Sequence, residues 1–320
     1  MKEKNIKDLD FKKVKTYPLS SRKCKVNKDD FGVPAVSAGA SFSEFIGGLP
    51  KIQAAKDLMD FCDLVRLAYE KKKKIIVAIG GHVIKTGVSP YLIELIKRGV
   101  ISMVSMNGSA AIHDLEIAIN AKTSEDVAEA LVDGSFGMAY ETGFHMNEAF
   151  AAAMKNATGA GREIARVMRN IKAPYKQNSL LYNADLCGVP ATVHIAIGTD
   201  IVHVHPNADG AAIGTATFND FKTYCSQVAQ LSPGAIYINL GSAVVMPEVF
   251  LKALTLVRNL GHDARGFHTA NFDMISHYRP NANVLSRPTI GSGGRSFNFI
   301  GCHEIMVPLF YTILNEKLKQ

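Results

Sequence analysis

The sequence predicts an α/β fold in which a doubly wound, mostly parallel sheet carries helices on both faces. Two observations support this. Short, continuous apolar runs are typical of strands that are buried on both faces, and these runs alternate with amphipathic segments of helical length. Of the 320 residues, 47% are hydrophobic and 20% are charged, as in ordinary globular proteins.

The first strand of the sheet is expected between two amphipathic helices. Residues 52–69 place apolar side chains at helical spacing, and the apolar run 75–79 that follows ends at two glycines. Ser89 is expected to cap the next helix, with Pro90 in its first turn, and Gly99 ends it.

The same alternation continues along the chain. Further strands are expected at residues 100–106, 190–197, 235–240 and 265–271. The matching helices are expected at residues 217–230, 247–260 and 303–317. Strands that alternate with helices in this way form parallel sheets.

Positive charge is concentrated near the start of the chain. The formal net charge is +7, and ten Lys or Arg residues lie within the first thirty residues. We therefore expect a basic N-terminal arm over residues 1–40 and a single domain over residues 41–320. Aromatic side chains are not interleaved with the basic ones as they are in nucleic-acid readers, so no nucleic-acid partner is expected.

The protein is expected to be cytoplasmic and to have no membrane partner. The charged first residues lack the apolar run of a secretory signal, and no window of about 18 apolar residues follows. The five cysteines are odd in number and widely scattered, so neither a disulfide framework nor a zinc knuckle is indicated.

Glycine-containing loops follow four of the expected strands. Their sequences are Gly80-Gly81-His82, Asn107-Gly108-Ser109, Gly198-Thr199-Asp200 and Gly241-Ser242. The carboxyl ends of parallel strands share one edge of the sheet, where glycine lets a ligand approach the backbone and helix N-termini bind anions. Together the four loops predict a nucleotide pocket at that edge.

Histidines supply the main candidates for acid–base catalysis. His113 and Asp114 lie just past the second of these loops, on a helix that also carries Glu116. There His113 can face the ligand, and the Asp114 carboxylate suits the positive end of the helix dipole. We take both as catalytic candidates.

A second group of histidines leaves an alternative open. His203 and His205 alternate along an expected strand, so their side chains share one face. With His194 they could bind a divalent metal, although no described metal spacing is met. His205 is the third catalytic candidate, and no metal ligand is assigned.

Four segments follow one another as they do in a known enzyme family. Residues 81–87 (GHVIKTG) resemble a cofactor segment of the form S-N-L-I-S-S-G, and residues 107–115 (NGSAAIHDL) occupy the place of T-A-G-G-V-E-E-D-L. Residues 234–242 resemble a G-M-I-L-G-G-G strand, and residues 267–270 resemble a Y-I-N-T-A segment. The resemblance covers residues 40–318 and is to deoxyhypusine synthase, an NAD-dependent enzyme that moves the aminobutyl group of spermidine onto a protein lysine.

The resemblance implies a Rossmann-type fold, NAD as the cofactor and a homotetramer. Taken with the strand-end loops, it points to the following cofactor-binding residues: Gly81, His82, Val83, Asn107, Gly108, Ser109, Asp200, Gly241, Ser242, His268 and Thr269.

The chain departs from this family at the residues of the covalent step. The family needs a lysine in a W-G-K segment, whereas residues 283–288 read NVLSRP, and Arg287 stays protonated and cannot act as that nucleophile. Residues 245–248 (VMPE) replace the family's paired histidines. Deoxyhypusine synthesis is therefore not expected. Residues 111–116 (AIHDLE) are also similar to an H-D-I-E element of archaeal-type ornithine cyclodeaminase, whose pocket holds NAD.

We therefore expect an NAD-binding enzyme, an oxidoreductase or transferase, that acts on a small amine or amino-acid-like substrate. Two alternatives stay open. One is a non-catalytic nucleotide- or metabolite-binding protein that kept the fold, and the other is a metal-dependent hydrolase that uses His194, His203 and His205.

Overall fold

The computed structural model describes residues 8–34 and 37–319, which form two compact units, Met1–Lys56 and Asp57–Gln320. The first unit contains most of the basic arm; the basic residues Lys2, Lys4 and Lys7 lie outside the described residues. Its elements are the short helices η1 (Phe11–Lys13), η2 (Leu19–Ser21), η3 (Lys28–Asp30) and α1 (Phe42–Gly47). None of these four helices contains a buried residue, whereas the second unit has an extensive core.

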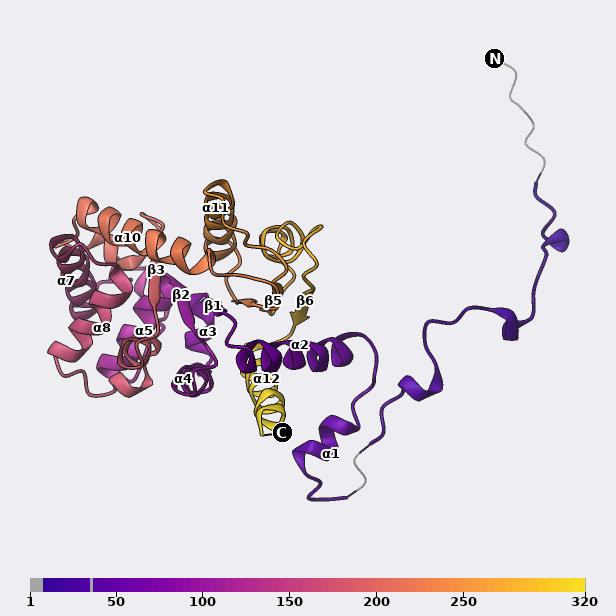
Figure 1. Cartoon of the computed structure of the whole chain (residues 1–320). Helices are drawn as coiled ribbons and strands as arrows, with labels where there is room; N and C mark the ends of the chain where they lie inside the picture. The colour runs from indigo at the N-terminus through magenta and orange to yellow at the C-terminus, as the bar shows by residue number, and fades with distance from the viewer. Residues whose placement is uncertain (1–7, 35–36, 320) are drawn as a thin grey trace, which may run out of the picture. The chain divides into compact units, whose positions relative to one another are not determined.

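The second unit is built on six parallel strands (Figure 1). They are β1 (Ile75–Ile79), β2 (Met103–Asn107), β3 (Ala191–His194), β4 (Ile236–Leu240), β5 (His268–Asp273) and β6 (Ser296–Ile300). The order across the sheet is β3-β2-β1-β4-β5-β6, and every neighbouring pair is parallel. The predicted doubly wound sheet is confirmed, and the strand order reverses between β1 and β4.

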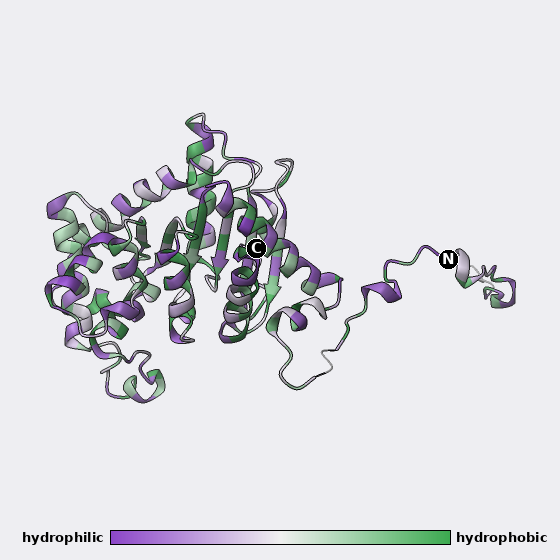
Figure 2. Cartoon of the chain, turned by 60° about the horizontal axis from the view of Figure 1, so that its bottom comes forward, coloured by the Kyte–Doolittle hydropathy of each residue, from purple (hydrophilic) through white to green (hydrophobic). Residues whose placement is uncertain are grey.

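Helices follow nearly every strand of the sheet. They are α2 (Gln53–Glu70), α3 (Gly81–Lys85), α4 (Ser89–Lys97), α5 (Gly108–Asn120), α6 (Val127–Ala130), α7 (Tyr140–Asn156), α8 (Ala160–Asn170), α9 (Leu180–Leu186), α10 (Gly210–Val228), α11 (Val245–Asn259) and α12 (His303–Leu318). Shorter turns are η4 (Lys176–Asn178) and η5 (Ile201–Val204), and η6 (Pro280–Ser286) is a π-helix. Figure 2 shows largely hydrophobic strands among helices that alternate between hydrophilic and hydrophobic residues, as amphipathic helices do. Among the described residues, no helix has the length and apolarity needed to cross a bilayer.

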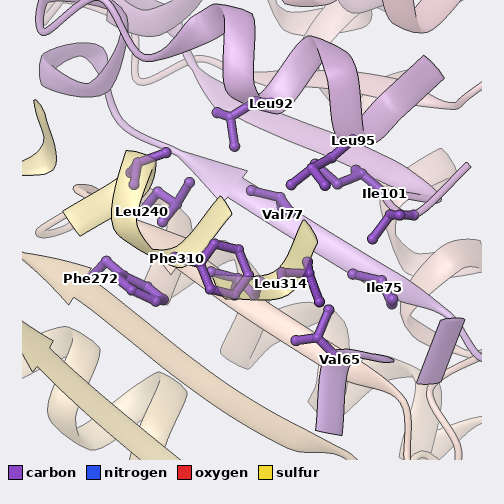
Figure 3. A pocket seen from close by; sticks show the side chains of 13 residues that line it. Val65, Ile75, Val77, Leu92, Leu95, Ile101, Leu240, Phe272, Phe310 and Leu314 are labelled. Atoms are coloured by element: carbon purple, nitrogen blue, oxygen red, sulfur yellow. The ribbon is translucent and has the colours of Figure 1, made fainter. Parts of the chain in front are cut away.

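One core layer lies between the sheet and helices α2, α4 and α12 (Figure 3). Val77 of β1 and Leu240 of β4 point into it, where Leu95 of α4 and Phe310 of α12 meet them. The space left in this layer measures about 10 Å³ and its lining is wholly apolar, so it is a packed core and not a ligand site.

The second core layer covers the opposite face of the sheet. Tyr237 of β4 stacks on Phe250 of α11, with ring centroids 3.7 Å apart, and its hydroxyl lies 3.0 Å from that of Tyr224 on α10. Because all five residues of β1 and all five of β4 are buried, these strands are covered on both faces. This explains their continuous apolar sequences.

Several element boundaries differ from the sequence-based expectations. Strand β3 ends at His194, and residues 201–204 form a short 3₁₀ turn, so the expected strand that places His203 and His205 on one face is wrong. Helix α10 begins seven residues earlier than expected, at Gly210, because the Asp209 side chain accepts hydrogen bonds from the first-turn N–H groups. Ser89 lies inside α4 and does not cap it.

Close backbone contact joins β1 and β4 where the strand order reverses. A Cβ on Gly80 would lie 2.1 Å from the Gly241 carbonyl oxygen. Gly241 itself has a φ of +60°, and a Cβ there would lie 2.6 Å from Nε2 of His303. The two strands can therefore end side by side only with glycine at both positions.

We predict that Gly241→Ala destabilises the protein more than Gly291→Ala does. Both glycines have left-handed backbones, but a Cβ on Gly291 would meet no atom within 4 Å. Gly291→Ala should therefore cost only the left-handed penalty of about 1 kcal/mol, and Gly241→Ala about 3 kcal/mol, because its Cβ also displaces His303. Urea unfolding of the two variants measures the difference, and equal losses would contradict the packing described.

Candidate functional site

The N-terminus of α5 opens at the carboxyl edge of the sheet. Asn107 ends β2 and caps the helix, since its Oδ1 accepts a hydrogen bond from the Ala110 N–H at 2.9 Å. Gly108 and Ser109 form the first turn. The free N–H groups of a helix start, with the positive end of its dipole, make this a place where an anion or a polar ligand can bind.

Two glycines let the loops after β1, β2 and β3 converge here. A Cβ on Gly108 would lie 1.9 Å from Oδ2 of Asp200, which follows β3. A Cβ on Gly81, after β1, would lie 2.2 Å from Oγ of Ser109. Any other residue at either position would push the loops apart. These three loops therefore meet at the carboxyl ends of their strands, and the fourth, at Gly241, contacts the first through Gly80.

A pocket of about 180 Å³ lies over the three loops. Its polar lining includes Lys85, Ser109, His113, Glu116 and Asp200. A larger pocket of about 620 Å³ shares Glu116 and Glu125 with it and also includes five polar side chains that the first lacks. These are Asn120, Lys122, Thr123, Glu141 and Thr142. The combined space suits a small molecule.

His113 belongs to a hydrogen-bonded relay that ends on a carboxylate. Its Nδ1 lies 2.6 Å from Oγ1 of Thr123, and the Thr123 hydroxyl donates to Oε2 of Glu116. A hydroxyl has one proton, so Thr123 must accept from Nδ1–H of His113. This sets the tautomer and leaves Nε2 of His113 as a proton acceptor, the state required of a general base.

Two carboxyl groups of the pocket have pKa values displaced in opposite directions. Burial opposes the ionisation of Glu116. The hydroxyls of Thr123 and Thr142, which donate hydrogen bonds to it, and His113, whose Nδ1 lies 3.5 Å from its Oε2, outweigh burial and lower the pKa of Glu116. Burial raises the pKa of Asp200 to about 6, and among the described residues no group donates a hydrogen bond to its carboxylate. A carboxyl group with a lowered pKa, in the same pocket as one whose pKa is raised to about 6, is an arrangement found in acid–base catalysts.

Asp114 has a structural role in place of the expected catalytic one. It is fully buried, and its carboxylate accepts hydrogen bonds from the Ser179 hydroxyl and from the N–H groups of Leu180 and Leu181. These groups form the N-terminus of α9, so Asp114 holds that helix against α5. It faces away from the pocket because it is one residue removed from His113 on the helix.

His205 also lies outside the pocket. Its Nε2 lies 2.8 Å from the Gly137 carbonyl oxygen, and its ring packs where a Cβ of Gly143 would be. Within residues 8–34 and 37–319, no three His, Cys, Asp or Glu side chains are close enough to form a metal site. His194 contacts Thr192 at 3.1 Å instead, so the hydrolase alternative lacks its ligand set.

The remaining predicted cofactor residues fall into two groups. Gly241, Ser242 and Val83 lie at the carboxyl edge but contact protein atoms: Gly241 packs on Val83, and Oγ of Ser242 accepts from the Met246 N–H. His82, beside them, is exposed. None of these four residues lines the pocket.

His268 and Thr269, which the sequence predicted to bind the cofactor, lie away from the pocket. They begin β5, and strands advance about 3.3 Å per residue, so they lie at the opposite edge of the sheet from the pocket. His268 accepts a hydrogen bond from the Arg295 N–H there, and Thr269 is fully buried. The similarity of residues 267–270 to a family segment did not reveal at which end of the strand they lie.

Sequence reasoning assigned no role to Glu116 or Thr123 of the relay, or to Thr142, which donates a hydrogen bond to Glu116. Glu116 has a local signal, since residues three apart on a helix are neighbours, and this spacing relates it to His113. Thr123 and Thr142 have no such signal, because they come from a loop and from α7.

We predict that Asp200→Asn makes the protein more stable at pH 8. The folded pKa of Asp200 is about 6, above the 3.8 of a free aspartate, so the native state binds this proton more tightly than the unfolded chain does. Its stabilising effect is complete below the unfolded pKa and is lost as pH rises through the folded pKa. Asparagine has no proton to lose, so the variant avoids this decrease in the free energy of unfolding. The decrease amounts to at most about 3 kcal/mol.

The free energy of unfolding of the variant and the wild type, measured from pH 3 to pH 8, tests this. The difference should grow between about pH 4 and pH 6 and then level off. Asp263→Asn, at an exposed position outside the pocket, is the control for the substitution itself. A difference that is flat with pH would contradict the buried setting of Asp200.

Comparison with known proteins identifies the fold. No protein-family model matches the sequence, and no curated protein matches it. Among solved structures, ArgZ, an arginine dihydrolase from the ornithine–ammonia cycle in cyanobacteria, is 15% identical with a TM-score of 0.50 over 83% of this chain and 33% of its own. AgrE, in its complex with ornithine and NAD+, is 13% identical with a TM-score of 0.51 over 84% and 34%.

A third structure matches over nearly its whole length. It is a provisionally named deoxyhypusine synthase from Entamoeba histolytica, 10% identical with a TM-score of 0.53, over 86% of this chain and 93% of its own. By contrast, the chain spans only about a third of the length of ArgZ and AgrE. Identities this low speak to fold and not to activity. The chain therefore has the deoxyhypusine synthase-like, Rossmann-type α/β fold that its sequence predicts.

Proposed function

We propose that the protein is an NAD-binding enzyme in which His113 acts as general base on a small amine or amino-acid-like substrate. The observation that carries the proposal is the relay from His113 through Thr123 to Glu116, beside Asp200, in a pocket at the carboxyl edge of a doubly wound sheet. Ligands of such sheets bind at this edge.

The residues present fit a dinucleotide. The N-terminus of α5 opens at the pocket with its Gly108 and Ser109 N–H groups, which suits a phosphate. The carboxylate of Asp200 has no partner among the described residues and can accept hydrogen bonds from ribose hydroxyls. AgrE, whose fold is similar, has been solved with NAD+ and ornithine. NAD would supply a hydride acceptor at this edge.

The charges of the adjoining pocket support an amine as substrate. Glu116, Glu125 and Glu141 line it against one lysine, Lys122. A surplus of carboxylates attracts a cationic amine and disfavours an anionic substrate. In this setting His113 would take a proton from the substrate at Nε2, and ionised Glu116 would stabilise the resulting imidazolium through Thr123.

The covalent chemistry of deoxyhypusine synthesis is not supported. The region that would need a lysine nucleophile forms η6, and Arg287, which follows it, donates hydrogen bonds to Asn283 and Tyr278. Glu248, in the place of the paired histidines, is bound to Arg279 and Lys252. Assembly as a homotetramer and a cytoplasmic location stay predictions.

We predict that NAD+ raises the melting temperature of the purified protein, because a ligand that binds only the native state stabilises it by mass action. Incubation with NAD+ and ornithine, arginine or spermidine in turn should generate reduced dinucleotide, measured by its absorbance. His113→Gln should lower kcat about 100-fold or more, as expected for loss of a general base, with the Kd for NAD+ nearly unchanged.

Exposed His262, changed to Gln, is the matched control and should retain full activity. Absence of any shift with NAD+ would refute the proposal. A shift without turnover of any amine would favour the alternative of a non-catalytic nucleotide-binding protein.

A further inference from the structure

Residues 11–28 of the first unit form a stretch of chain that is basic throughout. Seven of its 18 residues are Lys or Arg and none is Asp or Glu. The seven are all exposed: Lys12, Lys13, Lys15, Arg22, Lys23, Lys25 and Lys28. The four acidic residues of the described arm flank the stretch, at Asp8, Asp10, Asp29 and Asp30. The stretch therefore presents a concentrated positive charge to solvent.

Large apolar side chains are exposed in the same stretch. Five of them have exposed fractions between 47% and 80%: Phe11, Val14, Tyr17, Leu19 and Val26. Single exposed apolar residues are ordinary, but several gathered on one short segment mark a surface that binds a partner. The partner must therefore take up apolar side chains and cations together.

The conformation of the stretch narrows the class of partner. Its regular structure is limited to η1, η2 and the first residue of η3, and it contains no buried residue. Cations and apolar side chains alternate along it without a helical or strand period, so the stretch has no single shaped face to fit into a groove. A laterally continuous surface that attracts cations and accepts apolar groups just beneath its charged layer meets these requirements.

An anionic lipid bilayer is such a surface. Its headgroups attract Lys and Arg side chains, and apolar side chains enter the boundary between headgroups and acyl chains. A single-stranded nucleic acid would also attract the cations and could stack on Phe11 and Tyr17, but it offers no burial to Val14, Leu19 or Val26. The aliphatic side chains therefore favour lipid over nucleic acid.

We propose that residues 11–28 bind the protein to the surface of an anionic membrane. The cations lie at the headgroups and the five apolar side chains reach the acyl boundary. The sequence-based expectation of no membrane partner considered a leader and a spanning segment, and an arm that lies on the surface requires neither. This proposal is independent of the proposed function of the pocket.

Cosedimentation of the full-length protein with lipid vesicles tests the proposal. Vesicles of phosphatidylcholine with about 30% phosphatidylserine should bind the protein at about 0.1 M salt, and vesicles of phosphatidylcholine alone should not. Binding should weaken at least tenfold at about 0.5 M salt, because salt screens the attraction between exposed charges.

Charge reversal tests the role of the cations. Lys12→Glu combined with Lys13→Glu should lower the affinity for the anionic vesicles at least 25-fold, since each basic residue at such a surface contributes about fivefold. Lys71→Glu combined with Lys72→Glu is the matched control, because these lysines are also adjacent and exposed but follow α2 in the second unit. The control should bind as the wild type does. The first variant should keep the wild-type melting temperature, since neither lysine is buried.

Leu19→Ser separates lipid from nucleic acid, because it leaves the net charge unchanged. It should lower the affinity for anionic vesicles about tenfold through the loss of apolar burial. Equal binding to neutral and anionic vesicles, binding to neither, or equal losses in the two double variants would overturn the proposal. Tighter binding to a single-stranded oligonucleotide than to the anionic vesicles, with no effect of Leu19→Ser on either, would also overturn it and favour a nucleic-acid partner.

Discussion

The approach of the Asp200 carboxylate to the backbone of Gly108 is the contact on which the pocket depends. Without a Cβ at Gly108, the loop after β3 lies directly on the first turn of α5. Gly81 does the same for the loop after β1, against Ser109. Because β3, β2 and β1 are adjacent and parallel, their ends are already neighbours, and glycine removes the last steric barrier between the loops. A pocket then forms over them, lined also by residues between 112 and 142 of the long segment that joins β2 to β3.

The electrostatics of the pocket follow from how each acidic side chain is surrounded. The pKa of Glu116 is lowered in spite of burial because two hydroxyls donate hydrogen bonds to it and His113 lies beside it. Asp200 has no such donors, and burial alone raises its pKa to about 6. Two carboxyl groups in one pocket thus differ in proton affinity, and Thr123 passes the effect of Glu116 to His113. The fold supplies this difference through loops that are far apart in the sequence.

The surroundings of the carboxyl ends of the strands differ between the two halves of the sheet. Over β3, β2 and β1 the edge is open and polar, whereas at β4 Gly241 packs on His303 and Val83. Fold similarity alone would suggest an open crevice across the whole edge, and the described residues show it over one half.

Much of the fold was predictable because its signals are local. These signals act within a few residues: the continuous apolar run of β1, the Pro and Gly at the ends of α4, and the glycines after the strands. Together they predicted a parallel sheet with its site at the carboxyl ends of the strands. His113 and Asp200 were also within reach, as polar residues just past strand ends. Features that depend on tertiary contacts were not predictable from the sequence. Asp114 caps α9, about 65 residues away, and Thr142 reaches Glu116 from α7. By itself, the sequence determined the order and type of the elements, because these follow from side-chain periodicity and turn chemistry. Only the tertiary structure decided which polar groups meet, because hydrogen-bond partners depend on where separate loops come together in space.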